Sequence, residues 1–272
     1  RGNGWGQRYP IIAQMVQYHD FDIFGTQECF IHQLKDMKEA LPGYDYIGVG
    51  RDDGKEKGEH SAIFYRTDKF DVIEKGDFWL SETPDVPSKG WDAVLPRICS
   101  WGHFKCKDTG FEFLFFNLHM DHIGKKARVE SAFLVQDKMK ELGKGKELPA
   151  ILTGDFNVDQ THQSYDAFVS KGVLCDSYEK AGFRYAINGT FNNFDPNSFT
   201  ESRIDHIFVS PSFQVKRYGV LTDTYRSIVG KGEKKQANDC PEEIDIKTYQ
   251  ARTPSDHFPV KVELEFDQRQ QK

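Results

Sequence analysis

The chain has 272 residues, 38% hydrophobic and 14% aromatic, enough to bury the core of one large domain or two average ones. Its 42 aspartate and glutamate residues outnumber 36 lysine and arginine residues, so the net charge of −6 excludes a general nucleic-acid-binding surface. Five cysteines without paired spacing exclude a disulfide framework, and we expect them to be small buried side chains.

No apolar run approaches the roughly 18 residues of a membrane helix, and no secretion signal is recognisable. Because the chain begins with Arg1 rather than methionine, we expect a processed or trimmed product. The sequence predicts a soluble monomer, either cytoplasmic or exported after removal of a signal that this chain does not contain.

The first part of the chain shows helical patterns and then alternating ones. The patterns predict a glycine-rich loop over residues 1–6, a helix over 9–18 that begins near Pro10, a strand over 21–25 and a helix over 30–41. Alternation of apolar and polar residues then predicts strands over residues 44–49, 61–65, 70–74, 98–104 and 111–118.

The second part begins with the longest helical pattern. Helices are predicted over residues 124–142 and 165–169, and strands from residue 150 and over 203–210, 213–218 and 258–266. Residues 186–202 read as a polar loop and 222–255 as a long surface excursion. Since no glycine-rich phosphate loop follows the first strand, a layered α/β sandwich fits better than a Rossmann sheet.

One stretch, LPAILTGDFN at residues 148–157, predicts a buried strand that ends in polar side chains. Side chains alternate in an extended chain, so Asp155 and Asn157 would point to one side and Phe156 into the core. The alternative interpretation is an Asx turn that merely ends the strand.

Similar polar groups follow four further strands, and their joint occurrence predicts a shared cleft. These groups are Gln27 and Glu28; Asn117, His119, Asp121 and His122; Asp205 and His206; and Asp256 and His257. Oxygen ligands such as Glu28 and Asp256, without cysteine, suit Mg²⁺, with Mn²⁺ and Ca²⁺ as alternatives. Asp155 could take a proton from water, and a histidine beside a carboxylate would offset charge on a phosphoryl group.

The motifs TQE, NLHMDH, GDFN, RIDHIFVS and SDHFPV occur in this order, and the series resembles the endonuclease/exonuclease/phosphatase (DNase I-like) superfamily. The segments GVGRDDG, FWLSETP and GWDA are similar to an uncharacterised, mainly bacterial branch near the carbon-catabolite-repressor-type deadenylases. The resemblance implies a four-layered α/β sandwich and Mg²⁺-dependent phosphoester hydrolysis.

The resemblance also implies roles for individual residues. Glu28 would be the principal metal ligand, with Asp256 near the same metal or a second one. Asp155 would activate the attacking water with help from Asn157, Asp205 would pair with His257, and both His257 and His119 would contact the phosphate.

Further substrate-binding candidates are Arg97, as a phosphate clamp, and Asn117, Asp121 and His122 beside the N-x-H motif. For Arg97 a surface ion pair is an alternative, and for Asp121 and His122 a turn. The aromatic residues of the polar loop, Phe191, Phe194 and Phe199, could stack bases, although burial beneath that loop is the stronger alternative.

The family usually opens with a strand that ends in an asparagine before a segment like GNGW, and no such strand precedes Arg1. We therefore expect one domain over residues 1–272 that lacks its first strand.

The sequence favours a phosphodiesterase of the nuclease type, either a 3′→5′ exonuclease or an endonuclease. The alternative substrates are a sugar phosphate, an inositol phosphate or a phospholipid headgroup. A catalytically weak binding module on the same fold is the alternative from another class of function.

Overall fold

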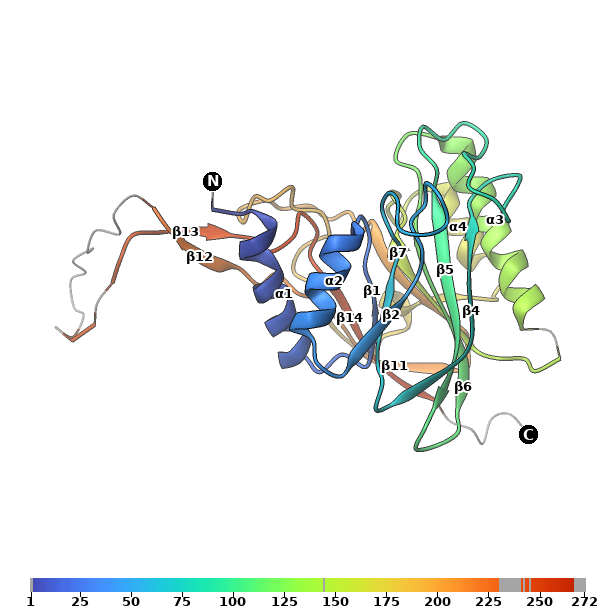
Figure 1. The fold of residues 1–272 in the computed structure, drawn as a ribbon, viewed down its shortest axis with the longest axis horizontal. Helices are drawn as coiled ribbons and strands as arrows, with labels where there is room; N and C mark the ends of the chain where they lie inside the picture. Colours follow the sequence, from blue (N-terminus) through green and yellow to red (C-terminus); the bar gives the residue numbers. More distant parts are fainter. Residues whose placement is uncertain (1, 144, 230–240, 242, 245, 267–272) are drawn as a thin grey trace.

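A computed structural model describes residues 2–143, 145–229, 241, 243–244 and 246–266 (Figure 1). Its centre is a six-stranded sheet in the order β4-β5-β6-β7-β10-β8, in which β6 and β7 run parallel and the other neighbours antiparallel. The strands are β4 (Phe70–Trp79), β5 (Ile98–Cys106), β6 (Glu112–His119), β7 (Ala150–Asp155), β10 (Asp205–Val209) and β8 (Cys175–Asp176).

A second layer of strands packs on this sheet and consists of two three-stranded pieces, β1-β3-β2 and β14-β11-β9. The strands are β1 (Ile23–Gly25), β3 (Ile63–Arg66), β2 (Tyr44–Ile47), β14 (Val260–Phe266), β11 (Phe213–Val220) and β9 (Phe183–Tyr185). Within the described residues, β1 and β14 each pair with a strand on one side only. The expected additional first strand stays a prediction.

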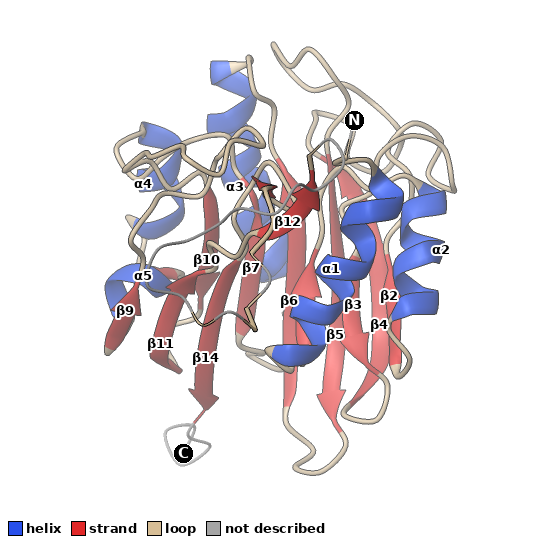
Figure 2. Cartoon of the chain, turned by 90° about the vertical axis from the view of Figure 1, so that its left-hand side faces the viewer, coloured by secondary structure: helices blue, strands red, loops and turns tan. Residues whose placement is uncertain are grey.

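Helices cover the outer face of each layer of strands, which completes four layers. Figure 2 shows α1 (Trp5–Tyr18) and α2 (Ile31–Ala40) in front of the sheet that contains β2 and β3. On the opposite side, α3 (Lys125–Leu142) and α4 (Gln163–Val169) lie against the six-stranded sheet (Figure 1). The short helix α5 (Ser177–Lys180) lies beside β10 and β11.

Each boundary between layers has its own hydrophobic core. Ala132, Val135 and Phe168 pack on one face of the six-stranded sheet, and Ile47, Phe115 and Val215 lie between the two layers of strands. Leu34, Met37 and Phe64 fill the space beneath α1 and α2. The structure therefore has the four-layered α/β sandwich expected from the sequence.

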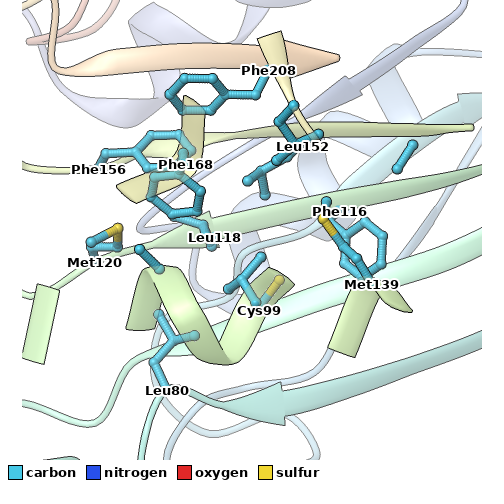
Figure 3. Close-up of a cluster of buried hydrophobic side chains, with 14 of the residues drawn as sticks. Leu80, Cys99, Phe116, Leu118, Met120, Met139, Leu152, Phe156, Phe168 and Phe208 are labelled. Carbon is cyan, nitrogen blue, oxygen red and sulfur yellow. The ribbon is translucent and has the colours of Figure 1, made fainter. Parts of the chain in front are cut away.

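Three buried aromatic rings pack together in the core next to the C-terminal end of β7 (Figure 3). The rings of Phe156, Phe168 and Phe208 are fully buried, and their centroids lie 5.2 Å from one another. Phe156 thus turns into the core as predicted, and it anchors the polar residues on both sides of it.

Several boundaries differ from the sequence patterns. Helix α1 begins at Trp5 rather than near Pro10, so Trp5 and Gly6 of the expected loop are already helical and Pro10 lies in the second turn. The excursion at 222–255 contains β12 (Tyr225–Ile228) and β13 (Tyr249–Arg252), which project together from the body (Figure 1). Part of this excursion lies outside the described residues.

Of the cysteines, only Cys99 is fully buried, whereas Cys29, Cys106 and Cys175 are half-buried and unbonded; Cys240 lies outside the described residues. The expectation of uniformly buried cysteines is therefore wrong. None of the described helices is long and apolar enough to cross a membrane.

We predict that the Phe168→Ala variant loses about 3–5 kcal/mol in the free energy of unfolding, since truncation leaves a cavity among rings that cannot collapse. Urea unfolding followed by circular dichroism measures the loss. The matched control is Phe199→Ala, because Phe199 is 70% exposed and its truncation should change stability by less than about 0.5 kcal/mol. Equal losses in the two variants would contradict this account of the core.

Candidate active site

The register of three strands brings three candidate residues together at one edge of the six-stranded sheet. The parallel pair β6 and β7 places His119 opposite Asp155, and the antiparallel pair β7 and β10 places Asp155 opposite Asp205. Close approach of β6 and β7 requires Gly154, since a Cβ there would lie 2.2 Å from the carbonyl oxygen of Leu118. The backbone pairing alone therefore gathers these side chains.

His257 completes this group from the segment that leads into β14. Its Nδ1 lies 2.8 Å from Asp205 Oδ2, and its Nε2 lies 3.9 Å from Asp155 Oδ2. Burial lowers the pKa of His257, but the hydrogen bond with Asp205 and the charges of Asp205, Asp155 and Asp256 outweigh it and raise that pKa to about 9. The imidazole is therefore cationic at neutral pH.

Asp155 is buried between these neighbours. Its pKa is raised to about 7, first by desolvation and then by the charge of Asp205, while His257 opposes the shift. A carboxyl group with this pKa exchanges a proton readily near neutral pH.

A second group of ligand atoms lies next to the first. Glu28, Glu59 and His119 each place one ligand atom within 4.8 Å of the others, and His119 Nε2 is 3.9 Å from Glu28 Oε1 and 3.5 Å from Asp155 Oδ2. Burial raises the pKa of Glu28, and the charges of Glu59 and Asp256 raise it further. Burial also lowers the pKa of His119 well below its ordinary value, so this ring is neutral.

Both groups open into one cleft of about 360 Å³. Its lining residues include most of the candidates and several apolar side chains: Glu28, Glu59, Leu95, Arg97, His119, His122, Asp155, Asn157, Phe191, Ile204, Asp256 and His257. The cleft thus combines four carboxylates with two cationic groups, Arg97 and His257.

Arg97 lies in this cleft but is almost fully buried, so the surface ion pair is wrong for it. Its Nε is 3.5 Å from Asp121 Oδ2, and its Nη2 is 3.0 Å from His122 Nδ1. Asp121 itself also accepts bonds from the backbone N–H groups of Ile123 and Gly124. Asp121 is not among the residues that line the cleft; it holds Arg97 and a turn in place, and substrate contact by Asp121 stays a prediction.

Asn157 and Asn117 occupy different environments. Asn157 lines the cleft, yet it has a φ of 50° and its N–H donates to Asp155 Oδ1, so the Asx turn considered from the sequence is present as well. Asn117 is fully buried, and its amide donates to the carbonyl oxygens of Thr26 and Ala62. Its side chain lies against Gly25 and fixes the strand end before Glu28, and substrate binding by Asn117 stays a prediction.

Sequence reasoning missed Glu59, which lies in a charged loop without strand periodicity. Its carboxylate forms an ion pair with Arg51 at 2.5 Å and has an oxygen atom within 4.8 Å of one of Glu28. The weak signal was its position three residues before an apolar run, in the segment GEHSAIF.

The loop phenylalanines are exposed rather than buried beneath their loop, so that alternative is wrong. Phe191, Phe194 and Phe199 are 41%, 40% and 70% exposed. Only Phe191 among them lines the cleft, whereas Phe194 packs against the guanidinium of Arg8.

Comparison with known proteins agrees with the family resemblance of the sequence motifs. The model of the Endonuclease/Exonuclease/phosphatase family matches residues 2–257. A solved structure of a mannosyl-6-phosphatase from Bacteroides thetaiotaomicron VPI-5482 is 86% identical in sequence with a TM-score of 0.90, and the match covers 97% of this chain and 92% of that chain.

Two curated proteins are more distant relatives. An uncharacterized protein of Acanthamoeba polyphaga mimivirus is 30% identical over 96% of this chain and 92% of its own length. The CCR4-Not complex 3′-5′-exoribonuclease subunit Ccr4 of Debaryomyces hansenii is 23% identical over 94% of this chain but only 35% of its own length.

His206, a polar group at a strand end, is buried among Phe156, Tyr165 and Phe208 instead of lining the cleft, and its Nε2 lies 2.8 Å from the carbonyl oxygen of Val158. Burial lowers its pKa, so the folded protein keeps the ring neutral while the unfolded chain protonates it near pH 6.5.

We predict that His206 makes the free energy of unfolding fall as the pH drops below about 6.5, by up to about 1.4 kcal/mol per pH unit. Urea titrations of the wild type and His206→Phe between pH 7.5 and 5.5 measure the two slopes. The variant should have the shallower slope, and parallel slopes would contradict the assignment of a neutral buried ring.

Proposed function

This chain belongs to the Endonuclease/Exonuclease/phosphatase family, and we propose that it is a metal-dependent phosphatase that removes the 6-phosphate from a mannosyl sugar. Enzymes of this family hydrolyse phosphoesters, and the resemblance drawn from the five motifs is confirmed. The 86% identity to a mannosyl-6-phosphatase over nearly the whole chain supports the choice of substrate.

The observation that carries the proposal is the charge pattern of the cleft. Arg97 and His257 supply its positive charge, while Glu28, Glu59, Asp155 and Asp256 supply four carboxylates. Such a cleft suits one phosphate group with a bound cation, whereas a nucleic-acid chain needs basic groups along several successive phosphates. The nuclease favoured by the sequence is therefore the second candidate, supported by the similarity to Ccr4.

The residues present fit a divalent cation. The negative charges of Glu59 and Asp256 raise the pKa of Glu28 at the cleft, and a cation would relieve this repulsion. In this proposal Glu28 and Glu59 hold the ion, with Asp256 beside them, and Mg²⁺ or Mn²⁺ suits such oxygen donors. When bound, the ion supplies Lewis-acid polarisation of the phosphoryl group.

The other side chains bind the phosphate and activate water. Asp155 accepts a proton from the attacking water, and Asn157 orients that water with its side-chain oxygen, since its Nδ2 is engaged by the carbonyl oxygen of Met120. The His257 imidazolium, held by Asp205, offsets charge on the phosphoryl oxygens, as does Arg97. Neutral His119 contacts the phosphate between Glu28 and Asp155.

The proposal is tested with Mg²⁺ by measuring phosphate release from mannose 6-phosphate and inositol phosphates, phosphocholine release from sphingomyelin, and nucleotide release from single-stranded RNA and DNA. We expect mannose 6-phosphate to give the highest kcat/KM and EDTA to abolish its turnover. Preferential degradation of RNA would establish the second candidate instead. No turnover of any substrate by a folded protein would favour the binding module.

We predict that Asp155→Asn lowers kcat on the preferred substrate by about 10²–10⁴-fold, because the amide cannot take the proton from water. The circular dichroism spectrum should not change. The matched control is Asp166→Asn, at an exposed position in α4, which should retain the full rate. A rate within a factor of three of the wild type in Asp155→Asn would exclude the proposed base.

We further predict that Glu28→Gln and Glu59→Gln each weaken Mn²⁺ binding by about tenfold or more, since each change removes a negative oxygen ligand. Titration calorimetry of the free enzyme with Mn²⁺ measures the affinity without relying on turnover. Glu56→Gln serves as the control, because Glu56 is exposed and pairs with Lys35 at 3.5 Å. Unchanged Mn²⁺ affinity in Glu59→Gln would remove this residue from the proposed ligands.

A further inference from the structure

We propose that Phe191 is the specificity-determining residue for the leaving group, against which the apolar face of the sugar packs while its phosphate lies at Asp155 and His257. The inference rests on the proposed phosphatase function and assigns a residue to the part of the substrate that departs.

Phe191 is held in an outward orientation by its neighbours in the chain. Thr190 and Asn192 on either side of it are buried, and in an extended segment the residue between two buried ones points the opposite way. The ring of Phe191 is accordingly 41% exposed and lines the cleft. Its direction is therefore imposed by the backbone.

The segment around Phe191 is fastened to the segment that carries the catalytic histidine. The backbone N–H of Asn192 donates to the carbonyl oxygen of Asp256 at 2.7 Å, and that of Phe258 donates to Thr190 at 2.6 Å. The ring centroid of Phe191 lies 5.1 Å from that of His257, at an interplanar angle of 69°. A substrate whose phosphate reaches His257 therefore brings its next atoms beside Phe191.

The remaining walls of the cleft suit a neutral leaving group with an apolar face. Leu95 and Ile204 also line the cleft, and four carboxylates there disfavour a second anionic group. Binding sites for small ligands combine apolar walls with a few polar groups that fix orientation. A hexose offers such a combination, since one face of its ring carries C–H groups and its rim carries hydroxyls.

Phe194 and Phe199 can be compared with Phe191, because they are phenylalanines that do not line the cleft. Both belong to the same loop and both are exposed. Phe194 is occupied by the guanidinium of Arg8, 5.2 Å from the ring centroid. The side chain of Phe199 is 70% exposed, so it supplies a matched substitution of the same chemistry at a position without access to substrate.

The test compares kcat/KM for mannose 6-phosphate with that for glycerol 3-phosphate, which has the same type of ester and no ring. In Phe191→Ala the ratio should fall about tenfold, mainly through KM for the sugar, since the ring of the sugar loses its apolar contact. Phe191→Tyr should restore the ratio, and Phe199→Ala should leave it at the wild-type value.

The outcomes separate this inference from the proposed function. If Phe191→Ala lowers kcat equally for both esters, the ring only positions His257 and the inference is overturned. If the variant retains the wild-type ratio, Phe191 does not contact the sugar and the inference is again overturned, while the phosphatase stands. If the wild type hydrolyses neither ester, the proposed function itself fails.

Discussion

The carboxylates of Asp155 and Asp205 lie side by side at the edge of a buried sheet, and the positive charge of the His257 imidazolium offsets the repulsion between them. Asp155 and Asp205 are opposed by strand register, so their repulsion is built into the backbone. The hydrogen bond at 2.8 Å from His257 to Asp205 supplies a positive charge beside both. The segments that deliver His257 are fastened to the loop at 190–194, so the positions of the loop and the charge depend on each other.

Much of this arrangement could be predicted from the sequence because it follows from strand endings. Short apolar strands that end in acid, amide or imidazole groups predict a cleft at one edge of a sheet, and the ordered motifs identify the family. The alternation that points Phe156 into the core also turns Asp155 to the opposite side, toward the cleft. The patterns alone predicted a layered α/β sandwich, whereas the number of four layers came from the family resemblance of the motifs.

The features that the sequence did not predict depend on contacts between segments distant in the chain or on irregular loops. The register between β6, β7 and β10 is a long-range property, so the sequence could not tell that Asn117 would be buried beneath the site while His119 lined it. Glu59 enters the site from an irregular charged loop through an ion pair with Arg51. The outward direction of Phe191 depends on backbone hydrogen bonds to a segment more than 60 residues away in sequence. Contacts between segments so far apart in the chain leave no periodic pattern in the amino-acid sequence.

The proposed active site depends most directly on the positive charge of His257. Proton and nitrogen NMR of its imidazole, followed as a function of pH in the wild type and in Asp205→Asn, measures that charge. We expect a protonated ring at neutral pH in the wild type, because the carboxylate neighbours of His257 raise its pKa to about 9, and a lower pKa in Asp205→Asn. A wild-type ring that is already neutral at pH 7, or a pKa unchanged by the substitution, would contradict this expectation.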